Sequence, residues 1–109
     1  MTEYLTGGKT TLTPDVLMTI ARMAALEVEG VSKMAPARGG GLFKRNEEGV
    51  LLEIEDGVVF LDIFVVLEKD VNIREVGRQV QEHAARAVTE MTGLDVSHVN
   101  IHVEDINQD

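Results

Sequence analysis

Three histidines are the side chains of this 109-residue sequence best suited to metal binding or proton transfer. His98 and His102 are four positions apart in an alternating stretch, so on a strand they share a face but stand about 13 Å apart along it. Two ligands at that distance cannot hold one metal ion unless the strand bends. His83 falls on a predicted helix, beside its apolar stripe. The histidines therefore predict no metal site.

Carboxylates are numerous, but their positions do not indicate catalysis. Thirteen acidic residues follow position 49, so chance pairs among them are unavoidable. The sequence places no histidine or lysine as an acid–base partner of these groups. The chain has no cysteine, which excludes a disulfide framework and a cysteine nucleophile. We predict no enzymatic activity, no catalytic residue and no cofactor. The carboxylates that we considered are Glu53, Glu55, Asp62, Glu68 and Asp70.

The basic segment of the chain is also its glycine-rich one. From residue 32 to residue 49 the sequence shows no periodic pattern, and Pro36 and three successive glycines interrupt any regular element. Successive glycine N–H groups can surround an anion, yet no Gly-Lys-Ser/Thr motif follows them. Two interpretations stay open: a flexible loop at about 33–49, and a weak contact with a small anion or a membrane surface. The contact residues would be Arg38, Gly39, Gly40, Gly41, Lys44 and Arg45.

Charge and hydropathy limit the partners and the location of the protein. The net charge of −9, from 19 acidic and 10 basic residues, repels the phosphate backbone of nucleic acids. No apolar run approaches the roughly 20 residues of a membrane-spanning helix, and the first residues show no secretory signal. We therefore expect a cytoplasmic protein with no direct membrane span and no nucleic-acid partner. At this length we expect residues 1–109 to form a single domain.

The stretch from residue 50 to residue 68 predicts a β-hairpin, because Asp56-Gly57 separates two apolar runs with alternating side chains. A two-residue turn at this point places Glu55 opposite Val58. Each earlier residue then lies opposite the residue equally far from the turn on the second strand. One face of the hairpin is then wholly apolar and must be covered by other elements. Its members are Val50, Leu52, Ile54, Val59, Leu61, Ile63, Val65 and Leu67.

Two helices and a further strand flank the hairpin. Thr13-Pro14 predicts the start of a helix that runs to about Glu29 and stops at Gly30. Asn72 predicts the start of a second helix that ends at Gly93. Residues 96–103 alternate as a strand does, and residues 9–12 could add a weak edge strand.

This order of elements predicts the fold class. A helix between the hairpin and the last strand makes that strand parallel to the second arm of the hairpin. Both helices then cover the apolar face. We predict an α/β (α+β) fold, a two-layer sandwich with two helices on one face of a small mixed sheet in (β)αββαβ order.

The reverse face of the hairpin mixes aromatic and acidic side chains. Because two helices cover one face alone, we expect this face to be open, and an exposed apolar patch of this kind indicates association with another protein. We hypothesise that the chain self-associates or binds a partner through Leu51, Phe60, Phe64 and Val66. The first helix is apolar around most of its circumference, so it is either well buried or carries a second stripe that faces a partner.

Two long segments resemble the alkaline-shock, or envelope stress response, protein family, formerly a domain of unknown function and found mostly in Gram-positive bacteria. The predicted hairpin lies between them, so the resemblance covers nearly the whole chain, although it contains no catalytic signature. The matching residues are Thr13 to Leu17 and Ile20 to Val31 in the first segment, and Val71 to Val76, Val80 to Glu82, Ala87 to Leu94 and Val99 to Val103 in the second.

The resemblance implies a non-enzymatic cytoplasmic protein of cell envelope homeostasis. Some relatives in this family self-associate, and a separate integral membrane protein holds them at the membrane. A homo-oligomer and an integral membrane anchor protein are therefore the partners that the resemblance implies. Two features depart from the family pattern: the glycine-rich version of the loop from Pro36 to Lys44, and the lack of a long charged tail.

Overall fold

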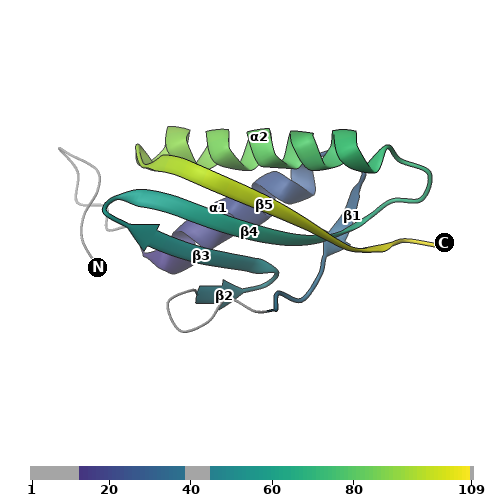
Figure 1. Cartoon of the computed structure of the whole chain (residues 1–109), viewed down its shortest axis with the longest axis horizontal. Coiled ribbons are helices and arrows are strands. Elements are labelled where there is room, and N and C mark those ends of the chain that lie inside the picture. The colour runs from purple at the N-terminus through teal and green to yellow at the C-terminus, as the bar shows by residue number, and fades with distance from the viewer. Residues whose placement is uncertain (1–12, 39–44, 109) are drawn as a thin grey trace.

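Two helices and five strands make up the part of the chain that the structure describes. This computed structural model describes residues 13–38 and 45–108. In order the elements are α1 (Pro14–Glu27), β1 (Val31–Met34), β2 (Arg45–Glu47), β3 (Val50–Glu55), β4 (Val58–Leu67), α2 (Ile73–Thr92) and β5 (Asp95–Ile106). Figure 1 shows α1 crossing behind the sheet and α2 running along β5. The predicted α+β sandwich is confirmed.

The hairpin of β3 and β4 has the predicted register. Glu55 pairs with Val58, and the pairing continues without interruption to Val50 opposite Ile63. Asp56 and Gly57 both have positive φ angles, of 52° and 77°. These are the angles that a two-residue turn needs if its twist is to match that of the strands.

Strand β5 lies parallel to β4 along the whole of β4, also as predicted. The other edge of β4 is shared, since β3 pairs with its first part and β1 with its end. The sheet is therefore mixed. The predicted apolar face of the hairpin packs against both helices, and Leu61, Ile63 and Val65 are 0% exposed.

Local capping signals set the ends of the helices. The Thr13 hydroxyl accepts from the Val16 amide at 3.3 Å, and the Asn72 side chain accepts from the Glu75 amide at 3.0 Å. Helix α2 ends at Gly93, as predicted. Helix α1 ends at Glu27, two residues earlier than expected.

The segment expected to be an irregular loop contains two strands, so that prediction is wrong for β1 and β2. Strand β4 has ten residues and β3 has six, so β3 leaves the end of β4 unpaired on that side. Val31–Met34 fills this gap as β1, and β2 pairs with β3. The weak strand expected at 9–12 lies outside the described residues.

Candidate interaction surfaces

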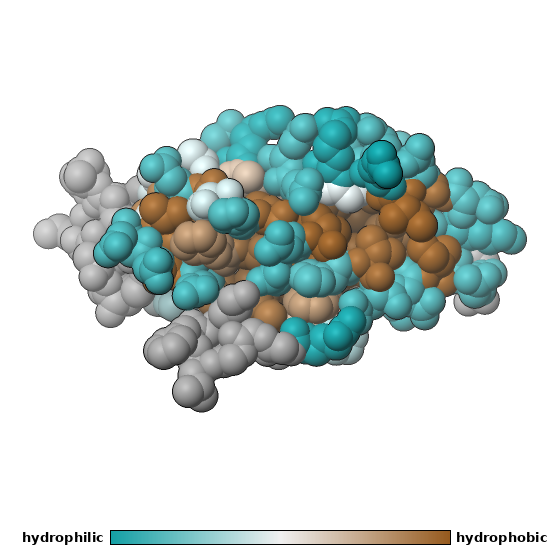
Figure 2. Space-filling model, in the orientation of Figure 1, coloured by the Kyte–Doolittle hydropathy of each residue, from teal (hydrophilic) through white to brown (hydrophobic). Residues whose placement is uncertain are grey.

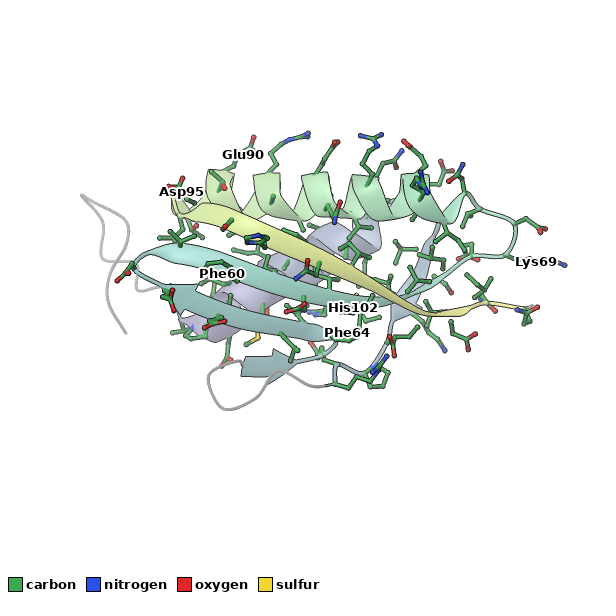
Figure 3. All side chains as sticks on the ribbon, viewed as in Figure 1. Phe60, Phe64, Lys69, Glu90, Asp95 and His102 are labelled. Atoms are coloured by element: carbon green, nitrogen blue, oxygen red, sulfur yellow. The ribbon has the colours of Figure 1, made fainter. Side chains whose placement is uncertain are left out.

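The reverse face of the sheet, the one without helices, carries matched rings on β4 and β5. Phe60 stacks on His98 with ring centroids 5.6 Å apart, and Phe64 stacks on His102 with centroids 4.3 Å apart and planes at 9°. The parallel register places each phenylalanine directly beside its histidine, and Figure 3 shows Phe64 next to His102. The prediction that the two histidines share a face is confirmed.

Asp62 lies between these two stacks and is 8% exposed. Its Oδ1 accepts from Asn100 Nδ2 at 3.2 Å and lies 3.0 Å from His102 Nε2. The sequence alone does not indicate a histidine beside this carboxylate, because the pair forms only in the observed register of β5, which contains irregularities at Ser97 and Glu104.

The Asp62–His102 pair joins β4 to β5. His102 is held on one side by the Phe64 ring and at its edge by the Asp62 carboxylate. Within residues 13–38 and 45–108, no group of three or more His, Cys, Asp or Glu side chains could hold a metal ion. The dyad thus fixes β5 against β4.

Three of the four predicted partner-binding residues are buried, so the expectation of an open sheet face is wrong for them. Leu51 is 3%, Phe64 2% and Val66 8% exposed, and they form a second small core with Ala35. The chain that leaves β1 stays beside β4, because the Ala35 amide donates to the Phe64 carbonyl at 2.9 Å. Phe60 is half-buried. Figure 2 shows that hydrophilic side chains interrupt the apolar ones on this face.

Arg38 is the predicted anion-contact residue whose side chain the structure describes, and it is engaged within the chain. Its Nε and Nη2 donate to the two carboxylate oxygens of Glu104, at 2.8 and 3.1 Å. These hydrogen bonds raise the pKa of Arg38 and lower the pKa of Glu104. Arg45 is described as backbone of β2, and Gly39, Gly40, Gly41 and Lys44 lie outside the described residues. Anion contact by this segment stays a prediction.

Large apolar side chains are exposed on the helices instead. On α1, Val16 is 40%, Met23 54% and Leu26 39% exposed. Their spacing of seven and three residues places them on one stripe, so the sequence-based alternative of a second stripe on α1 agrees with the structure. On α2, Ile73 is 50% and Met91 62% exposed. In the described residues neither helix is long and apolar enough to cross a membrane.

The chain is similar in sequence to uncharacterized bacterial proteins. The uncharacterized protein YqhY of Bacillus subtilis (strain 168) is 32% identical over 107 residues, covering 94% of this chain and 79% of YqhY. The uncharacterized protein Spy1535 of Streptococcus pyogenes serotype M6 is 36% identical over 108 residues, covering 96% of this chain and 82% of Spy1535. A second uncharacterized protein of that organism, Spy1614, is 29% identical over 106 residues, covering 91% of this chain and 88% of Spy1614. No solved structure matches.

The alkaline-shock protein family, described by its cell envelope-related function, matches residues 3–108. This match names no catalytic activity, and it spans both helices and all five described strands. The resemblance seen in the sequence to the envelope stress response family is therefore confirmed, and the chain belongs to the alkaline-shock protein family.

Proposed function

We propose that this protein is a non-enzymatic cytoplasmic scaffold of the envelope stress response, which self-associates and binds a partner near the membrane. The partner would be an integral membrane protein that recruits this chain. The chain would act as a single domain. The observation that carries this proposal is the exposed stripe of Val16, Met23 and Leu26 on α1. Exposed apolar surface of this kind is typical of protein contacts.

The stripe has the geometry of a helix that lies in a groove of a partner or beside a partner helix. Val16 and Met23 are two helical turns apart, a distance of about 10 Å along α1. Each side chain is roughly half exposed, so covering it completely stabilises a complex by about 1 kcal/mol per residue. The opposite side of α1 is fixed in the core, where Leu17, Ala21 and Ala25 are 0% exposed. The stripe is thus held rigidly for docking.

The ionisable groups of the described residues support a structural role. Asp62, Arg38 and Arg78 each bind groups of their own chain. An acid–base catalyst would need such a group to face a substrate cavity. No observation favours the alternative, a regulatory module that binds a small anion, since the Arg38 guanidinium is already bound to Glu104.

Affinity purification of the tagged protein from its native cell, with and without detergent, tests the proposal. We expect an integral membrane protein to co-purify in detergent, and Met23→Glu with Leu26→Glu to abolish its recovery. Thr89→Glu is the control, because Thr89 is exposed on α2 and the change adds a charge outside the stripe. Equal recovery by all variants, or the absence of a membrane protein from the wild-type sample, would contradict the proposal.

A further inference from the structure

We infer that two copies of this chain pair through the free edge of β5, antiparallel and centred on Ile101, and that the two sheets join into one. This inference rests on the self-association in the proposed function and specifies its surface. The surface between β5 and α2 would contact the same surface of the second copy. The occupant is therefore another copy of this chain.

The outer edge of β5 carries backbone groups that do not pair with β4. Within the described residues β5 pairs with β4 on one side, and its other edge meets no strand. The Gln81 side chain donates to the Val99 carbonyl at 2.9 Å, so Val99 directs its backbone groups away from β4. Backbone direction alternates along a strand, and pairing with β4 is regular from residue 98 to residue 103. Ile101 and Val103 therefore also present their N–H and C=O groups at the free edge.

An antiparallel pair about Ile101 uses all of these groups together. It places Val99 of one copy opposite Val103 of the other, and Ile101 opposite Ile101. This allows about six backbone hydrogen bonds, including those to the Val99 carbonyls, which also accept from Gln81. The three side chains are half-buried against the core of their own chain, and the partner's identical row would cover their remaining surface. On the reverse face Asn100 lies opposite His102, so no like charges meet.

Features at both ends of this segment limit the pairing to one register. The register with β4 is irregular at Ser97 and at Glu104, and such irregularities twist an edge away from a neighbouring strand. Asp95, Glu104 and Asp105 add negative charge beyond residues 98–103. A shifted pairing would bring these carboxylates together, which favours a closed pair over an open chain of strands.

Gly77 indicates that the α2 helices also approach each other. A glycine inside a helix destabilises it by roughly 0.5–1 kcal/mol relative to alanine, and an added Cβ at Gly77 would meet nothing within 4 Å. The fold of one chain therefore does not need glycine at this position. Gly77 lines a hollow of ≈ 420 Å³ between α2 and β5, together with half-exposed Ile73 and the side chains of Ile101 and Val103. In the antiparallel pair this hollow faces its copy, and Gly77 lets the two helices come close.

The charges beside this hollow are complementary when α2 faces an antiparallel copy of itself. Arg74 is exposed and forms no ion pair with the described residues, whereas Glu82 lies about two turns further along α2. An antiparallel arrangement centred on Arg78 brings Arg74 of each copy to Glu82 of the other, which also binds Arg78 of its own chain. Arg78, near the centre, is neutralised by Glu75 at 2.5 Å and by Glu82 at 2.7 Å. The Arg78 side chains of the two copies therefore meet as neutralised groups and not as free positive charges.

Single cysteines test the register, because the natural chain has none. Directly opposed residues that exchange hydrogen bonds have Cα atoms about 5.5 Å apart, which a disulfide can span. We expect Ile101→Cys to form a disulfide-linked dimer on mild oxidation. Val99→Cys and Val103→Cys should each stay monomeric on a non-reducing gel, but a mixture of the two should cross-link. Failure of Ile101→Cys to cross-link, or equal cross-linking of all three variants alone, would overturn the inference.

Gly77→Arg tests the helix contact without disturbing the monomer, since that position faces open space. We expect the dissociation constant of the dimer, from sedimentation equilibrium, to rise about tenfold or more, with the melting temperature of the monomer unchanged or higher. Gln79→Arg, exposed on the same helix, should leave the dimer intact. An unchanged dimer in Gly77→Arg would refute the surface. Recovery of the membrane partner by monomeric Gly77→Arg would show that the proposed scaffold is independent of this pairing.

Discussion

Replacing Phe64 by alanine tests whether this side chain is buried, as in the structure, or lies on an open sheet face, as the sequence suggested. The ring is 2% exposed and packs with Ala35, Leu51 and Val66. Truncating a buried phenylalanine to alanine costs about 3–5 kcal/mol, because transfer energy is lost and a cavity remains. The close stack on His102, at 4.3 Å, accounts for about 0.5–1.5 kcal/mol of this. We expect Phe64→Ala to lower the free energy of unfolding by about 3–5 kcal/mol, against a total of about 5–15 kcal/mol for a small domain.

Phe60→Ala is the matched control, because Phe60 projects from the same face of the same strand. Phe60 is half-buried, and its stack on His98 is looser, at 5.6 Å, so we expect a loss of about 1–2 kcal/mol. Urea titrations followed by far-ultraviolet circular dichroism suit a chain without tryptophan. A loss below about 1 kcal/mol for Phe64→Ala, or a larger loss for Phe60→Ala, would show that this face is no closed second core.

Two further changes test how distant segments are held together. Gly30→Ala should cost about 2–4 kcal/mol in urea titrations, because φ is 106° and an added Cβ would lie 2.7 Å from Val76 Cγ2. Gly57→Ala, with φ of 77° and no neighbour within 4 Å, should cost about 1–2 kcal/mol, and an equal loss at both positions would contradict the packing argument. Arg38 lowers the pKa of Glu104 below 4.5, so the native state binds fewer protons, and the stability from this pair is present above pH 4.5 and is lost as the pH falls through the lower native value. Arg38→Ala should flatten this acid dependence in thermal melts, and an unchanged slope would show that the pair does not form in solution.

The elements predicted correctly are those whose signals lie within a few residues of each other. Asp56-Gly57 between alternating runs determines both the turn and the register of the hairpin, since the partners are close in sequence. Asn72 and Gly93 act in the same way on α2, because each cap binds backbone groups within one helical turn. The parallel placement of β5 followed from the handedness of the crossover through α2.

The features that were missed depend on contacts between distant segments. Strand β1 forms because the end of β4 extends beyond β3, and four residues such as Val31–Met34 carry no alternation that could reveal it. The burial of Phe64 depends on Ala35, in a segment that resembles a loop. The Asp62–His102 pair depends on irregularities in a register with β4 that periodicity cannot supply.

The distribution of charge decides which surfaces of this acidic protein can meet another copy. A net charge of −9 opposes close approach in general, so an interface must lie where charges are absent or balanced. The hairpin end, with Glu53, Glu55 and Asp56, would bring like charges together. The stretch from Val99 to Val103 has no carboxylate, and on the neighbouring turns of α2 the charges of Arg74 and Arg78 balance those of Glu75 and Glu82. Electrostatics and backbone pairing thus favour the same edge of the sheet, whereas the apolar stripe on α1 remains available to a different protein.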